Sequence, residues 1–134
     1  MRAPALNPVD CYPVEQRDGS VHVRGKRDPL RPPTASATPA NVVIVGGGAA
    51  GNSAAQTLRR EGYAGRITLL SADASPPCDR PNLSKNFLAG SADEAYNMLQ
   101  PDGFYAEHDS DLKLDARVTA IDVDHRQVEL ADGD

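Results

Sequence analysis

The sequence predicts an α/β fold, because three features follow one another between residues 41 and 73. An apolar, β-branched run at 41–45 indicates a strand buried on both faces, and glycines in the pattern G-x-G-x-x-G come directly after it. Residues 52–61 then have the composition of a helix, and a second apolar run at 66–70 indicates another strand. A strand, a tight turn, a helix and a strand in this order form the beginning of a Rossmann-type domain.

Each glycine of the turn has a physical role in binding a dinucleotide. Gly46 permits the sharp turn, Gly48 lets the backbone approach a pyrophosphate, and Gly51 lets the helix and strand pack closely. Free N–H groups and the positive end of the helix dipole then face the phosphates. The predicted phosphate-binding residues are these glycines and the alanines between them: Gly46, Gly48, Ala49, Ala50 and Gly51.

A carboxylate at the end of the second strand meets a further requirement of this fingerprint. Asp73 follows the last glycine by about 20 residues, where its oxygens can accept hydrogen bonds from ribose hydroxyls. An acid at this position disfavours a 2′-phosphate, so NADP is not expected in this half, whereas FAD and NAD both remain. The alternative is an ordinary strand–helix–strand turn without a ligand, because glycine-rich turns are common.

Length, charge and cysteine content exclude several classes of protein. The chain has 134 residues, a length typical of one domain, with a net charge of −5 and a pI near 5.1. The sequence therefore indicates neither nucleic acid nor a membrane as a partner. Cys11 and Cys78 lie far apart and form no metal-binding pair, so we expect a reduced, cytoplasmic location and no metal site.

Residues 1–24 are predicted to form a separate piece of the chain. Two short alternating runs, 12–16 and 21–23, flank an Asp-Gly pair at 18–19, which is a strong hairpin signal. A two-stranded hairpin alone is marginal in water, so this one should belong to a larger sheet. Residues 25–40 follow as a proline-rich linker.

The N-terminal piece resembles the C-terminal end of a Rieske iron–sulfur domain. The resemblance is carried by Arg2-Ala3-Pro4-Ala5-Leu6-Asn7-Pro8, Tyr12-Pro13-Val14 and the stretch 18–23. It implies that the cluster-binding cysteines and histidines lie upstream of Met1, so a 2Fe-2S cluster is expected only in the Rieske module of a longer parent protein. One histidine cannot make such a site, and His22 is expected to point to solvent.

A proline-stiffened loop at 76–85 follows the second strand and carries Arg80 and Lys85. A helix is expected to begin near Ser84 and to stop at Gly90. Because a loop beyond this strand lies near the carboxyl edge of the sheet, both cations are placed to meet phosphate or an electron-rich ring. The alternative is a surface loop with two solvated charges.

Together, Gly46-x-Gly48-x-x-Gly51, Asp73 and Arg80-Pro81-x-Leu83-Ser84-Lys85 resemble the flavin-dependent ferredoxin reductases and the related apoptosis-inducing-factor-like proteins. Both belong to the pyridine nucleotide–disulfide oxidoreductase superfamily. The resemblance covers residues 41–133. It implies that the glycines hold the FAD pyrophosphate, Asp73 holds the adenosine ribose, Arg80 contacts FAD, and Lys85 lies beside the flavin ring as the catalytic group. Cys78 departs from the family, which usually has tyrosine there.

The remaining chain is expected to contain a helix at 104–108, a strand at 112–114, and a hairpin made of 118–123 and 127–130. No second G-x-G-x-x-G occurs, so no NAD(P) domain is expected and the chain reads as a truncated piece. The fold class is therefore a partial Rossmann-type FAD-binding domain, preceded by a small β-hairpin and a linker. The predicted domains are a Rieske remnant at 1–24, a linker at 25–40, and the N-terminal part of an FAD-binding domain at 41–134.

By resemblance, the parent is an oxidoreductase that passes a hydride from NAD(P)H to FAD and then single electrons to an iron–sulfur centre. An iron–sulfur protein or domain is its expected partner. Two alternatives remain, a non-catalytic nucleotide-binding remnant and an NAD-dependent Rossmann dehydrogenase fragment. The loop from Arg80 to Lys85 argues against the dehydrogenase. The chain alone is expected to lack NADH-oxidising activity.

Overall fold

A computed structural model describes residues 9–27 and 35–133 of the chain. Some predicted features lie outside these residues, namely the first Rieske-like motif, the middle of the linker and the last residue: 2–8, 28–34 and Asp134. The chain divides into two compact units, Met1–Pro32 and Pro33–Asp134. The domain boundaries at residues 24 and 40 stay a prediction.

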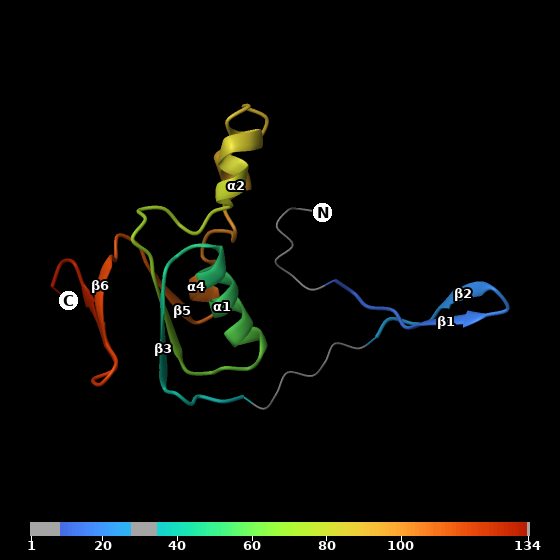
Figure 1. Cartoon of the computed structure of the whole chain (residues 1–134), viewed down its shortest axis with the longest axis horizontal. Coiled ribbons are helices and arrows are strands. Elements are labelled where there is room, and N and C mark those ends of the chain that lie inside the picture. Colours follow the sequence, from blue (N-terminus) through green and yellow to red (C-terminus); the bar gives the residue numbers. More distant parts are fainter. Residues whose placement is uncertain (1–8, 28–34, 134) are drawn as a thin grey trace. The chain divides into compact units, whose positions relative to one another are not determined.

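The first unit contains an antiparallel hairpin of β1 (Val14–Arg17) and β2 (Ser20–Val23), drawn in blue in Figure 1. Both central residues of its turn have positive φ, 50° at Asp18 and 74° at Gly19, as a type I′ turn requires. The predicted hairpin is therefore confirmed, and His22 is exposed as expected. The opposite face carries three valines that are more than 60% exposed: Val14, Val21 and Val23.

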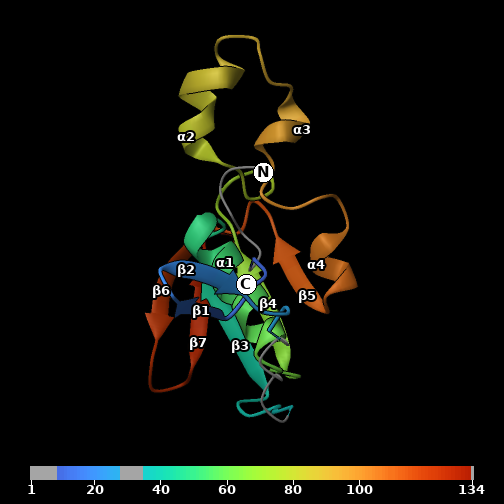
Figure 2. The same ribbon diagram turned by 90° about the vertical axis from the view of Figure 1, so that its right-hand side faces the viewer.

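The second unit is organised around a parallel sheet with the strand order β3–β4–β5. β3 (Asn41–Val45) pairs with β4 (Arg66–Leu70), and β4 pairs with β5 (Ser110–Lys113). Helix α1 (Ala49–Arg60) connects β3 to β4 and contacts both strands (Figures 1 and 2). The predicted α/β fold class is confirmed, although α1 begins at Ala49 rather than at residue 52.

The centre of this sheet is β4, not β3. Ile67 and Leu69 of β4 are completely buried, whereas Val43 and Val45 of β3 are 47% and 49% exposed. The prediction that the first strand is buried on both faces is wrong, because β3 lies at an edge of the described sheet and one of its faces is open. An apolar run does not distinguish an edge strand from a central one.

Between β4 and β5 the chain forms a projection, residues 79–98, which we call the helical arm (Figure 2). It consists of α2 (Arg80–Asn82), the π-helix η1 (Leu83–Phe87) and α3 (Glu94–Asn97). The helix predicted to begin near Ser84 begins instead at Arg80. Pro81 fits the first turn because the N–H that it lacks has no partner inside a helix at that position.

Helix α4 (Phe104–Glu107) precedes β5 and agrees with the predicted helix at 104–108. β5 begins at Ser110, two residues before the strand predicted at 112–114. A separate antiparallel pair, β6 (Val118–Asp122) and β7 (Gln127–Leu130), follows and confirms the predicted C-terminal hairpin.

Candidate functional site

The glycine turn between β3 and α1 has the geometry expected of a dinucleotide-binding turn. Gly46 has φ of +109°, a conformation that side chains disfavour, and its N–H donates to the Leu70 carbonyl over 2.8 Å. A Cβ on Gly51 would lie 2.0 Å from the Gly46 carbonyl oxygen. A Cβ on Gly48 would meet nothing within 4 Å. The turn therefore has no room for a side chain at Gly51, whereas the space next to Gly48 is open.

Gly47 is a fourth required glycine that the sequence analysis did not single out. A Cβ at this position would lie 2.4 Å from both Cβ and Oγ of Ser71. Ser71 follows β4, is 1% exposed, and accepts a hydrogen bond on Oγ from the Asp73 N–H over 3.2 Å. The run of three consecutive glycines, 46–48, was the signal that could have revealed this contact.

The structure brings together two of the predicted site residues, Asp73 and Arg80. Nη2 of Arg80 lies 2.6 Å from Oδ2 of Asp73, and both side chains are more than half exposed. Asp73 comes just after β4, at the carboxyl edge of the sheet, where ligands bind in this class of fold. An exposed ion pair contributes only about 0–1 kcal/mol, so the two side chains can separate at little cost.

Lys85 lies on the helical arm and is not brought into contact with the Asp73–Arg80 pair. Its backbone interrupts η1, with φ of −122° and ψ of −108°, and its carbonyl oxygen accepts from the Ala89 N–H over 2.9 Å. The side chain is exposed, and its ammonium forms no ion pair with the described part of the chain. Lys85 is therefore a free cation, as far as the described residues go, on a short, irregular helix.

A buried amide in the first turn of α1 was also missed. Asn52 is 0% exposed, and its Oδ1 accepts from the Tyr105 hydroxyl over 2.8 Å. Burial raises the pKa of Tyr105 to about 12. Nδ2 of Asn52 has no hydrogen-bond partner among the described residues. The spacing of Asn52 and Ala55, three apart on the buried face of α1, was the signal that could have identified it.

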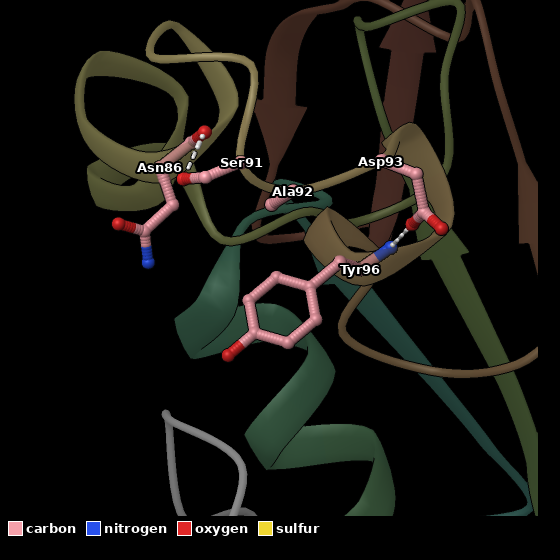
Figure 3. A pocket seen from close by; sticks show the side chains of 5 residues that line it. All are labelled: Asn86, Ser91, Ala92, Asp93 and Tyr96. Carbon is pink, nitrogen blue, oxygen red and sulfur yellow. Dashed lines mark hydrogen bonds between the residues drawn. The ribbon is translucent and has the colours of Figure 1, made fainter.

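A hollow of about 400 Å³ lies elsewhere, between η1 and α3 of the helical arm (Figure 3). It contains none of the predicted cofactor-binding residues, and its lining is mainly polar: Asn86, Ser91, Ala92, Asp93 and Tyr96. In Figure 3 the carboxylate of Asp93 accepts from the Tyr96 N–H, and the Ser91 hydroxyl donates to the Asn86 carbonyl. Because these polar groups bond to one another and the hollow contains none of the predicted cofactor-binding residues, the glycine turn is the better candidate site.

Comparison with known proteins identifies the family. A family model described as pyridine nucleotide-disulphide oxidoreductase matches residues 40–134. The chain belongs to this family. Rubredoxin-NAD(+) reductase of Pseudomonas putida is 41% identical over 93 residues, which cover 69% of this chain and 24% of that protein. Apoptosis-inducing factor 3 of Homo sapiens is 32% identical over 143 residues, covering 97% of this chain and 23% of that protein.

Solved structures place the chain in the ferredoxin-reductase branch of this family, as the sequence resemblance predicted. The covalent putidaredoxin reductase–putidaredoxin complex matches with a TM-score of 0.68 and 41% identity, over 70% of this chain and 22% of that one. The ferredoxin reductase of the CYP199A2 system from Rhodopseudomonas palustris matches with a TM-score of 0.66 and 35% identity, over 71% and 23%. The chain spans about a quarter of the length of these relatives.

Residues 9–27 and 35–133 contain neither a membrane-spanning helix nor a metal-binding cluster. No helix in these ranges is long and apolar enough to cross a bilayer. Nor does that part of the chain hold a group of three or more histidine, cysteine or acidic side chains that could bind a metal ion.

Proposed function

We propose that residues 41–134 form the FAD-binding portion of an NAD(P)H-dependent flavoprotein oxidoreductase of the ferredoxin-reductase type. The observation that carries this proposal is the glycine turn, where Gly46 requires positive φ, Gly51 permits close packing, and Gly48 leaves open space. These are the separate roles that a dinucleotide-binding turn assigns to its glycines. Family membership favours FAD over NAD as the ligand of this half.

The residues around the turn fit the parts of FAD. Backbone N–H groups at the start of α1, from Gly48 to Gly51, would hold the pyrophosphate, because they are free of helical partners and lie at the positive end of the dipole. Asp73 would accept bonds from the adenosine ribose and release Arg80 to contact the cofactor. Lys85 would place its ammonium beside the flavin ring, where a cation stabilises negative charge.

The proposed electron donor and acceptor follow from the relatives. These include rubredoxin-NAD(+) reductase and the ferredoxin–NAD(+) reductase subunit of a benzene 1,2-dioxygenase system, and one solved relative is joined to putidaredoxin. We therefore propose that the parent would take two electrons from NAD(P)H as a hydride onto FAD and deliver them one at a time to an iron–sulfur protein or domain. When bound, FAD supplies the conversion between two-electron and one-electron transfer.

Residues 1–24 are proposed to be the end of a Rieske-like domain whose 2Fe-2S cluster belongs to the parent protein only. The alignment with apoptosis-inducing factor 3 extends over 97% of the chain, whereas the alignment with rubredoxin-NAD(+) reductase covers 69%. The N-terminal unit is thus shared with one group of relatives. The exposed valine face of the β1–β2 hairpin supports its assignment to a larger sheet. The proposed location is cytoplasmic.

A second candidate, a remnant that binds nucleotide without catalysis, is favoured by one observation. Val43 and Val45 of β3 are nearly half exposed, so the sheet that supports the glycine turn is not covered on that side by described residues. FAD would then be held less firmly than in a complete domain. An NAD-dependent dehydrogenase fragment is less favoured, because the stretch from Arg80 to Lys85, which resembles the ferredoxin reductases, forms α2 and η1 of the helical arm.

A ligand comparison on the purified 134-residue chain tests the proposal. We expect FAD to bind with a structured visible spectrum and quenched flavin fluorescence, ADP to compete with it, and FMN to bind poorly because it lacks the adenosine diphosphate. Tighter binding of NAD⁺ than of FAD would favour the dehydrogenase instead. Added NADH is expected to leave the bound flavin oxidised, and binding of neither nucleotide would overturn the proposal for this chain.

A further inference from the structure

The helical arm has almost no interior, yet two amide side chains are buried at its base. Within residues 80–96, all of which the structure describes, Asn82 is the only buried residue, at 7% exposed. Asn97, the last residue of α3, is 1% exposed. Nδ2 of Asn82 donates to Oδ1 of Asn97 over 2.5 Å. The buried contact between the two sides of the arm is therefore polar.

Asn97 also connects three parts of the arm. Its Oδ1 holds α2 through Asn82, and its Nδ2 donates to the carbonyl of Asp93, the N-cap residue of α3, over 3.4 Å. Its backbone carbonyl accepts from the Asp79 N–H over 2.7 Å, at the point where α2 begins. The start of α2, the side of α2 and the start of α3 thus meet at one residue.

Apolar packing does not provide an alternative means of holding the arm. Its large apolar side chains are between 39% and 78% exposed: Leu83, Phe87, Leu88 and Tyr96. The hollow between η1 and α3 separates the two sides further along the arm (Figure 3). A buried, paired hydrogen bond specifies one arrangement where apolar contacts would allow several.

We propose that Asn82 and Asn97 form a positioning pair that fixes the orientation of the stretch from Arg80 to Lys85. Asn82 lies between the two cations in sequence, and α2 continues directly into η1, so a change in orientation at Asn82 would move both of them. Lys85 has non-helical backbone angles inside η1, and its ammonium forms no ion pair with the described residues. What Lys85 meets in that orientation rests on the proposed function, whereas the positioning itself does not.

Amide hydrogen exchange on the ligand-free 134-residue chain tests the positioning. Asn97→Leu leaves the Asn82 donor buried without an acceptor, so exchange at residues 83–88 should accelerate about tenfold while the amides of β4 stay unchanged. Asn82→Leu should give the same local acceleration, because it leaves the Asn97 acceptor unpaired. Asn86→Leu, at an exposed amide of the same arm, is the matched control and should change neither region.

The double variant Asn82→Leu/Asn97→Leu separates positioning from stability. With both polar groups removed, the thermal midpoint should recover toward that of the wild type, whereas exchange at residues 83–88 should stay fast. Unchanged exchange in both single variants, or recovery of slow exchange in the double variant, would overturn the inference. FAD affinity should fall about tenfold in the double variant. Failure of the wild-type chain to bind FAD would count against the proposed function, and exchange would still decide the positioning.

Discussion

The open space above Gly48 yields the sharpest test of the cofactor site. In Gly48→Ala the new Cβ meets nothing within 4 Å, and the backbone there, with φ of −84° and ψ of −171°, is one that alanine adopts freely. The folded chain should therefore accept the methyl group. Bound pyrophosphate should not, because the backbone must approach it closely at this glycine.

Two effects of opposite sign follow from this substitution. Stability should stay the same or rise by about 0.4–1 kcal/mol, because alanine restricts the unfolded chain. FAD binding should weaken by about 1.5–3 kcal/mol, the contribution of one hydrogen bond to a charged phosphate, or roughly 10–150-fold in the dissociation constant. Urea denaturation measures the stability, and quenching of flavin fluorescence measures the affinity.

Gly25→Ala is the matched control for this experiment. A Cβ on Gly25 would also meet nothing within 4 Å, its φ lies outside the left-handed region, and it belongs to the first unit, away from the turn in sequence. Neither stability nor FAD affinity should change with this control by more than about 0.5 kcal/mol. If Gly48→Ala binds FAD as tightly as the wild type, pyrophosphate does not lie over Gly48 and the assignment of the turn is wrong.

Three further predictions concern residues around the turn. Gly51→Ala should cost about 1–3 kcal/mol, seen as a lower urea midpoint, because its Cβ would meet the Gly46 carbonyl at 2.0 Å; a midpoint like that of the wild type would mean that the turn can shift. Asp73→Asn should change stability by less than about 0.5 kcal/mol, since its ion pair is exposed, yet it should weaken FAD binding about tenfold in the same fluorescence titration. The control Asp102→Asn, in a surface turn, should change neither stability nor FAD affinity. Because the pKa of Tyr105 is raised to about 12 from an ordinary 10, stabilisation present below pH 10 should be lost between pH 10 and 12. The free energy of unfolding should fall by about 1 kcal/mol over this range, after allowance for partial exposure. In Tyr105→Phe, the urea midpoint should therefore fall less between pH 9 and pH 11.5 than it does in the wild type.

The glycine turn could be predicted from sequence because its geometry is encoded in the residue type itself. Positive φ at Gly46 and close approach at Gly51 both exclude a side chain, and the G-x-G-x-x-G spacing records those exclusions. The pairing of Asp73 with Arg80 could not be predicted in the same way. An irregular loop separates them, and neither helical nor strand periodicity relates their positions.

The errors and omissions also have physical causes. The run at 41–45 is apolar on both faces whether or not other residues cover it, so composition alone predicted that both faces of β3 are buried. Asn52, Asn82 and Asn97 were missed because asparagine is usually exposed, and only its partners show when it is buried. The helix of the arm begins at Arg80, before the predicted start near Ser84, because proline is favoured in the first turn of a helix as well as in loops.

The edge of β3 that no described strand pairs has a practical consequence for producing the chain. Its sequence, Asn41-Val42-Val43-Ile44-Val45, has high β-propensity and carries no charge or proline, and strands with this character recruit copies of themselves. Concentrated samples should therefore form intermolecular β-structure before the rest of the domain unfolds. A lysine introduced by Val43→Lys, at a position already half open to water, should delay that self-association.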